Sequence, residues 1–201
     1  TGNPIREGIN LMDKPRAKQS YAFDSNRPVL AIIGGSQGSV SLNRHFENNF
    51  EQYTDSNVQI LWQCGKNDYP RLEVLNDYEN IYIIPFTENM TSFYSAADVI
   101  ISRAGALVLS EMSYLGKAMV LIPFPHSAGD HQTRNAEAFS NSGAALLITQ
   151  HELNTGTLEN VALDLINNPD KIAEMEKKSE EMRIQNATEK ITKTIMEIAR
   201  S

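Results

Sequence analysis

A run of five apolar residues followed at once by a glycine-rich turn constrains the fold of this chain most. The run is Val29–Ile33, and the turn at residues 34–38 reads Gly-Gly-Ser-Gln-Gly. Apolar runs of this length are typical of strands buried on both faces, as in parallel sheets. A helix beginning beyond the turn would point its free N–H groups and positive dipole end at it, which suits a phosphate. Tight turns also need glycine for steric reasons alone, so both interpretations stay open here.

The turn does not match two common nucleotide-binding motifs. Its glycines are spaced G-G-x-x-G, whereas the dinucleotide fingerprint is G-x-G-x-x-G. The next predicted strand, 58–63, ends without the acidic residue that would hold an NAD ribose. No Gly-Lys-Ser/Thr follows the turn, so the sequence also excludes a P-loop.

Further apolar runs alternate with amphipathic stretches along the chain. The predicted strands are 29–33, 58–63, 81–84, 98–102, 118–122 and 144–148, and the predicted helices are 39–53, 69–75, 90–97, 106–115, 130–141, 158–167, 169–183 and 189–200. This alternation predicts an α/β fold, a Rossmann-like parallel sheet of about six strands with helices on both faces. Ser39 or Ser41 is expected to cap the first of these helices. Such sheets bind ligands at the carboxyl ends of their strands, here the turns at 34–38, 85–90, 102–106 and 123–132.

The first 28 residues are polar and are interrupted by three prolines, which indicates a linker. We expect one short helical turn near residues 6–12 and no helix in 14–20. The chain is therefore divided into an interdomain linker remnant (1–28), a Rossmann-like domain (29–168) and a C-terminal helical tail (169–201). The chain begins without Met, so we expect it to be a fragment of a longer protein.

Charge and cysteine content exclude several classes of protein. The formal net charge is −7, which argues against a general nucleic-acid binder and against adhesion to an anionic membrane through a basic patch. The single cysteine, Cys64, excludes a disulfide framework and a cysteine-rich zinc site and fits a reducing cytosolic compartment. The sequence has no run of about 18 apolar residues and no recognisable signal peptide.

Several polar side chains follow the predicted strands. Ser36 and Gln37 lie in the first turn, where a hydroxyl can hold a diphosphate oxygen or simply cap the helix. Glu111 lies about one and a half turns into the helix after Gly105, so its carboxylate can accept hydrogen bonds from a ribose diol or remain a solvated surface group. Arg6 is a surface charge unless the linker folds over the cleft, where it can pair with phosphate.

The loop after the fifth strand has two interpretations. His126, Asp130 and His131 raise the possibility of a metal site, but zinc needs three or four ligands and no further cluster is available. Carboxylate and amide groups suit the hydroxyls of a sugar, so we favour sugar recognition by Asp130, Gln132 and Asn135.

Five motifs in order along nearly the whole chain resemble the MurG family of bacterial peptidoglycan glycosyltransferases. They are Gly-Asn-Pro-Ile-Arg (2–6), Gly-Gly-Ser-Gln-Gly (34–38), Ser-Arg-Ala-Gly-Ala-Leu (102–107), Ser-Glu (110–111) and the segment 123–136 with its core Asp-His-Gln-Thr-Arg-Asn-Ala (130–136). The resemblance implies the C-terminal, donor-binding half of a GT-B enzyme that transfers N-acetylglucosamine from UDP-GlcNAc to lipid I, making lipid II.

The resemblance also implies roles for particular residues. Arg6 is expected near the donor, Ser36 on the nucleotide-sugar, and the backbone of Thr87 at the uracil edge. The helix from 106 to 111 is expected to bind diphosphate and ribose, with Glu111 on the ribose hydroxyls, and Gln132 to read the GlcNAc hydroxyls with Asn135 nearby. The full set of expected substrate-binding residues is Arg6, Gly35, Ser36, Gln37, Thr87, Gly105, Ala106, Leu107, Ser110, Glu111, Gln132 and Asn135.

The family's acceptor-binding glycine turn and the histidine thought to act in catalysis belong to its N-terminal half and are absent from this sequence. We therefore expect no catalytic residue here, a base supplied by the missing half, inverting transfer, no metal and no other cofactor. The missing half would bind lipid I and make the membrane contact, placing the full-length protein in the cytoplasm, peripheral on the inner face of the bacterial cell membrane. Two alternatives stay open: a UDP-GlcNAc 2-epimerase-like enzyme, and a non-catalytic nucleotide-sugar-binding subunit of a split transferase.

Overall fold

The computed structural model describes residues 2–6 and 8–199, and its centre is a parallel sheet. The strands are β1 (Val29–Ile33), β2 (Gln59–Gln63), β3 (Ile81–Ile84), β4 (Val99–Ser102), β5 (Met119–Leu121) and β6 (Leu146–Leu147). Their order across the sheet is β3-β2-β1-β4-β5-β6, and every adjacent pair is parallel. The predicted Rossmann-like parallel sheet is confirmed; the order of its strands was not predicted.

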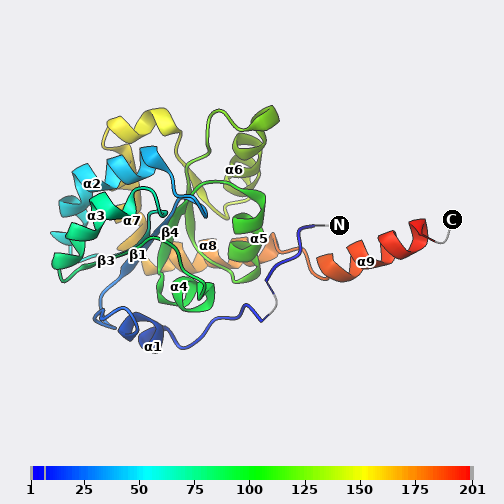
Figure 1. The fold of residues 1–201 in the computed structure, drawn as a ribbon, viewed down its shortest axis with the longest axis horizontal. Helices are drawn as coiled ribbons and strands as arrows, with labels where there is room; N and C mark the ends of the chain where they lie inside the picture. The colour runs from blue at the N-terminus through cyan, green and yellow to red at the C-terminus, as the bar shows by residue number, and fades with distance from the viewer. Residues whose placement is uncertain (1, 7, 200–201) are drawn as a thin grey trace.

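Helices cover both faces of the sheet (Figure 1). They are α1 (Lys14–Gln19), α2 (Val40–Thr54), α3 (Tyr69–Leu72), α4 (Met90–Ala96), α5 (Ala106–Tyr114), α6 (His131–Asn141), α7 (Thr157–Ile166), α8 (Pro169–Glu181) and α9 (Ala187–Ile198), with short 3-10 helices at Glu73–Asp77, Ala128–Asp130 and Gln150–Asn154. Helices α2, α3, α7 and α8 pack on one face and α1, α4, α5 and α6 on the other. Helix α9 projects away from this body, as Figure 1 shows.

The core follows the alternation of side chains along the strands. In β1, Leu30 and Ile32 contact the α2 face, whereas Val29, Ala31 and Ile33 contact the α5 face. All five are buried, as expected of a strand that is covered on both sides. The unbroken apolar run at residues 29–33 is therefore accounted for by burial on two faces.

The position predicted for a helix in the first 28 residues is wrong. The described residues of 6–12 form no helix, and α1 lies instead at Lys14–Gln19. The Asp13 side chain caps it by accepting from the Arg16 N–H at 3.0 Å. Lys14 and Lys18 both bind the Asp98 carboxylate at 2.8 Å, which ties α1 to the amino-terminal end of β4. A helix this short shows no apolar period, so its position depends on these contacts and could not be predicted from hydrophobic spacing.

Element boundaries differ slightly from those predicted. The predicted helix 69–75 is α3 followed by a 3-10 helix, and the predicted strand 144–148 is reduced to the two residues of β6. The division of the chain into linker, domain and tail stays a prediction. Helix α8, placed in that tail, contributes Met175 to the core beneath the sheet.

Candidate functional site

A cavity of about 480 Å³ opens where β1 and β4 end side by side. We call it the strand-end cavity. Its lining residues come from the turns after β1, β4 and β5 and from the starts of α2, α5 and α6: Gly34, Gly35, Gln37, Gly38, Ser39, Val40, Ser102, Arg103, Gly105, Val108, Phe124 and Gln132. The strand order reverses between β1 and β4, and open α/β sheets bind ligands at this point, outside the carboxyl ends of the strands.

The glycines of the turn after β1 are required by close backbone approaches. A Cβ on Gly38 would lie 2.0 Å from the Cys64 carbonyl oxygen, and one on Gly34 would lie 2.5 Å from the Ser39 nitrogen. Gly35 has φ +93°, a conformation that favours glycine, and the space where its Cβ would lie is empty. The steric interpretation therefore holds for Gly34 and Gly38, while Gly35 also leaves open space.

Two helices begin at the strand-end cavity with their first N–H groups uncapped by side chains. Helix α2 has Ser39 as its N-cap residue and α5 has Gly105, and neither N-cap makes a side-chain capping bond. Residue Ile33 pairs with Ser102 in the sheet, so both helices start from the same level of two adjacent strands. Their unpaired N–H groups and positive dipole ends favour an anion.

Among the residues that the structure describes, none requires glycine at position 105. Its φ of −70° and ψ of 139° are open to any residue, and a Cβ there would meet no atom within 4 Å. Glycine at this position leaves the α5 N-terminus accessible to a group that approaches the backbone closely.

Arg103 is a buried cation at the cavity, and its hydrogen-bond partners within residues 2–6 and 8–199 include no carboxylate. Its guanidinium donates to the backbone oxygens of Ile122 and Pro123 at 3.0 and 3.1 Å and to the hydroxyls of Ser39 and Ser41. It also donates to the Gln150 side-chain oxygen at 2.6 Å. Burial lowers the pKa of Arg103 to about 10, so it stays charged at neutral pH. The side chain thereby fastens four chain segments to one another and brings a positive charge to the cavity.

The expected capping role of Ser39 is wrong in its detail. Ser39 does occupy the N-cap position of α2, but its hydroxyl accepts from Arg103 and does not bond the helix N–H groups. The sequence could not reveal this because Arg103 lies 64 residues further along the chain.

Gln63 at the end of β2 connects two of the predicted site turns and was missed by sequence reasoning. Its amide nitrogen donates to the Gly35 carbonyl at 3.2 Å, and its amide oxygen accepts from the Thr87 N–H at 3.0 Å. Thr87 is buried, and Gln63 already engages its backbone N–H. A ligand at Thr87 would meet the carbonyl oxygen, or would have to displace Gln63.

The loop after β5 brings Gln132 to the cavity. Its side-chain oxygen accepts from the Phe124 N–H at 3.0 Å, which leaves the amide NH₂ free to donate to a ligand hydroxyl. The Asp130 carboxylate accepts from Thr133 at 2.6 Å, and Asn135 donates to the Ala104 carbonyl at 3.1 Å. In the part of the chain that the structure describes, no three His, Cys, Asp or Glu side chains gather into a possible metal site.

Glu111 on α5 is buried and belongs to a small hydrogen-bond network whose other end, Arg6, is exposed. One carboxylate oxygen accepts from Arg6 and the other from the Tyr94 hydroxyl, each at 2.8 Å. Burial and the neighbouring carboxylate raise the pKa of Tyr94 well above its usual value, so it remains a donor. The structure thus brings together Arg6 and Glu111, both predicted substrate-binding residues, and adds Tyr94, which the sequence did not single out. Each carboxylate oxygen has a second lone pair for a further donor.

The structure places the predicted substrate-binding residues in three groups. Gly35, Gln37, Gly105 and Gln132 line the strand-end cavity. Ala106, Ser110 and Asn135 line a neighbouring cavity of about 230 Å³ on the other side of α5, where the Asn3 side chain donates to Ser110 at 3.1 Å. The others lie outside the lining of both: Ser36 and Leu107 are exposed, and Arg6, Thr87 and Glu111 hold the contacts described above.

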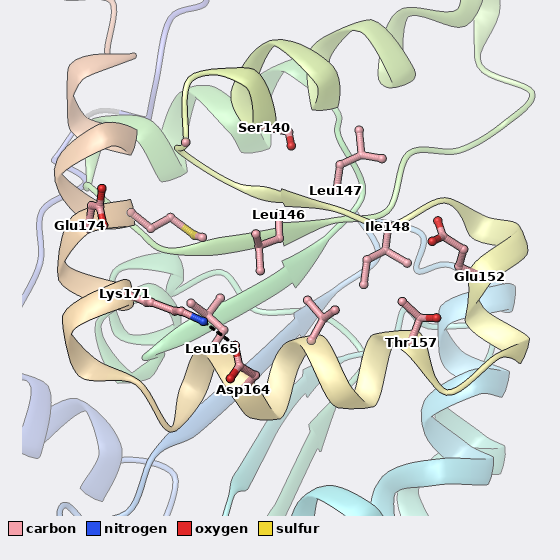
Figure 2. A pocket seen from close by; sticks show the side chains of 13 residues that line it. Ser140, Leu146, Leu147, Ile148, Glu152, Thr157, Asp164, Leu165, Lys171 and Glu174 are labelled. Carbon is pink, nitrogen blue, oxygen red and sulfur yellow. Dashed lines mark hydrogen bonds and ion pairs between the residues drawn. The ribbon is translucent and has the colours of Figure 1, made fainter.

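A larger cavity, of about 530 Å³, lies at the β6 edge of the sheet. Figure 2 shows Leu146 facing Leu165 of α7 across it, with Ile148 nearer Thr157 and the Lys171–Asp164 ion pair beside Leu165. Its lining holds no residue of the glycine turn and neither of the N-termini of α2 and α5. This larger cavity therefore lacks the features that suit the strand-end cavity to an anion. Within the described ranges, no helix is both long and apolar enough to cross a bilayer.

Comparison with protein families gives a match over most of the chain. Residues 29–195 match the family described as "Glycosyltransferase family 28 C-terminal domain". This range contains both helix N-termini and the whole strand-end cavity.

Several curated relatives share the name "UDP-N-acetylglucosamine--N-acetylmuramyl-(pentapeptide) pyrophosphoryl-undecaprenol N-acetylglucosamine transferase". The protein of that name from Flavobacterium psychrophilum is 34% identical over 203 residues, covering 100% of this chain and 55% of the relative. The one from Cytophaga hutchinsonii is 37% identical over 200 residues, covering 98% and 54%. The crystal structure of MurG from Acinetobacter baumannii aligns with a TM-score of 0.76 and 29% identity, covering 98% of this chain and 55% of that one. The chain thus spans about half the length of the curated relatives it matches.

Proposed function

Because this chain belongs to the glycosyltransferase family 28 C-terminal domain family, we propose that it is the donor-binding half of an inverting N-acetylglucosaminyltransferase. Its ligand would be UDP-GlcNAc, the donor that its relatives are named for. The reaction would be the transfer of N-acetylglucosamine to lipid I, giving lipid II for peptidoglycan. The observation that carries the proposal is the pair of uncapped helix N-termini, those of α2 and α5, at one cavity beside the buried charge of Arg103.

Each part of the donor has a matching group. The diphosphate would lie against the starts of α2 and α5, where N–H groups and helix dipoles stabilise negative charge. The ribose hydroxyls would donate to the Glu111 carboxylate, and the GlcNAc hydroxyls would accept from the Gln132 amide. The uracil would lie near Thr87, whose carbonyl oxygen is the backbone group left for it.

The chemistry this half supplies is stabilisation of the leaving group. Direct displacement at the anomeric carbon leaves the electron pair of the broken C–O bond on the β-phosphate, so the departing UDP gains one negative charge, and the helix N-termini would stabilise it as it develops. A base from the other half would take the proton of the acceptor hydroxyl. Lipid I and the inner face of the cell membrane would likewise contact the other half, so this chain alone would bind donor without completing transfer. We propose that no metal or other cofactor takes part.

Calorimetric titration of the chain with UDP-GlcNAc, UDP and NAD tests the proposal. We expect both uridine nucleotides to bind and NAD to give no heat. Gln132→Ala should weaken UDP-GlcNAc and leave UDP unchanged, since Gln132 is assigned to the sugar alone. Binding of NAD, or indifference to UDP, would overturn the proposed function, whereas equal loss of both uridine ligands would overturn only the role of Gln132.

A further inference from the structure

The Ser39 hydroxyl at the start of α2 has both of its lone pairs occupied by one side chain. Arg103 donates to the Ser39 oxygen from Nε at 3.1 Å and from Nη2 at 2.9 Å. A hydroxyl has two acceptor lone pairs and one O–H donor. Only the O–H is left, and among the described residues no acceptor is paired with it. Ser39 therefore acts at the strand-end cavity purely as a donor.

Because its hydroxyl accepts from Arg103, Ser39 makes no capping bond to the N–H groups of α2. A serine at an N-cap usually accepts from the helix N–H groups, a bond that stabilises a helix by about 1 kcal/mol. Here the first intrahelical bond runs from the Asn43 N–H to the Ser39 carbonyl, and the Ser39 side chain caps nothing. The N–H groups of residues 40–42 consequently have no intrahelical partner. The contact with Arg103 leaves them open toward the cavity side of the helix.

Arg103 itself cannot reach a ligand without breaking bonds. Its five N–H groups are engaged by neutral acceptors: two backbone oxygens, two hydroxyls and one amide oxygen. A buried guanidinium without a carboxylate is costly, and an anion placed nearby offsets that cost. Its position at the lining of the cavity puts its charge behind the Ser39 hydroxyl.

We propose that Ser39 binds the diphosphate of the donor directly, with Arg103 as the positioning residue that fixes its hydroxyl as a donor and adds positive potential. This inference rests on the proposed function, and it adds a binding residue that the motifs did not indicate.

Ser39→Ala is the variant that tests this, and Ser41→Ala is its matched control. Both changes remove one hydroxyl acceptor of Arg103, but Ser41 is not part of the cavity lining. We expect Ser39→Ala to weaken UDP by about tenfold, the loss of one hydrogen bond to a charged group, and to leave uridine binding unchanged. Ser41→Ala should bind UDP as the original chain does, although its thermal stability falls similarly. Ser39→Thr, which keeps the hydroxyl, should restore UDP binding.

The outcomes separate the inference from the proposed function when inorganic pyrophosphate is titrated beside UDP. UDP affinity within twofold of the original chain in Ser39→Ala, or equal loss of UDP and uridine, overturns the role of Ser39. If the original chain binds pyrophosphate but not UDP, the proposed function is overturned. The affinity of Ser39→Ala for pyrophosphate then still decides the role of Ser39. Binding of neither overturns both. If Ser39→Ala does not fold, Ser39→Cys, a weak donor of similar shape, should show the same selective loss of UDP.

Discussion

Replacement of Glu111 by glutamine should abolish the preference of the chain for a ribose over a 2′-deoxyribose. The Glu111 side chain is 8% exposed and accepts from Arg6 and Tyr94 at 2.8 Å, so its carboxylate is fixed in place. A hydrogen bond to a charged group contributes about 1.5 to 3 kcal/mol. Since 1.4 kcal/mol is a factor of ten, we expect UDP to bind the original chain about 10- to 100-fold more tightly than 2′-deoxy-UDP.

The assay is a calorimetric cycle of two proteins and two ligands. In Glu111→Gln, the affinity for UDP should fall by about tenfold or more. The affinity for 2′-deoxy-UDP should change much less, so the two affinities converge. The amide keeps the size of the side chain and an oxygen for the Tyr94 hydroxyl, which limits the effect on folding. Tyr94→Phe is the control for position: it removes one of the two groups that hold the carboxylate and should reduce the same ligand preference partially. An equal loss of both ligands in Glu111→Gln would refute the assignment of Glu111 to the ribose.

Three further predictions follow from local geometry. Gly105→Ala should change the free energy of unfolding by less than about 1 kcal/mol, since a Cβ there meets none of the described atoms within 4 Å. Calorimetric titration should nevertheless show UDP binding weakened severalfold, and unchanged UDP binding would show that no ligand approaches this backbone. Burial lowers the pKa of Lys117 to about 8, so the folded chain loses this proton at a lower pH than the unfolded chain does. Urea denaturation should therefore show the free energy of unfolding rising by about 2 kcal/mol between pH 7 and 9.5. Lys117→Met should remove this rise, and a rise that persists in the variant would assign it to other groups. Asp98→Asn should lower the free energy of unfolding by about 3 kcal/mol in urea denaturation, because it leaves the buried Lys18 without its carboxylate partner. A decrease below about 1 kcal/mol would mean that α1 is held mainly by apolar packing.

The fold was predictable because its signals are local. Each strand of the sheet carries an apolar run, and turn residues and glycines separate the runs from the helices, so the elements and their alternation could be read directly. Helix α1 could not be predicted in this way, since it depends on a cap from Asp13 and on ion pairs to Asp98, which lies 80 residues beyond Lys18 in the sequence. The order of the strands likewise depends on how the crossovers pack.

The site was predictable only where a motif marks it. The glycine turn, Gly105 and Gln132 lie at one cavity, as their positions after strands suggested. Arg103 and Gln63 were missed because their roles come from hydrogen bonds to residues far along the chain. A polar residue at or just after the end of an apolar run, as both are, is the sequence signal that could have drawn attention to them. The roles of the individual substrate-binding residues stay predictions.

Backbone amide chemical shifts during titration with UDP-GlcNAc test the central claim most directly. The account predicts that the largest shifts map to residues 34–42 and 104–109, the glycine turn and the two helix N-termini at the strand-end cavity. Shifts concentrated instead at residues 146–148, 161–165 and 171–175, around the larger cavity at the β6 edge, would contradict it.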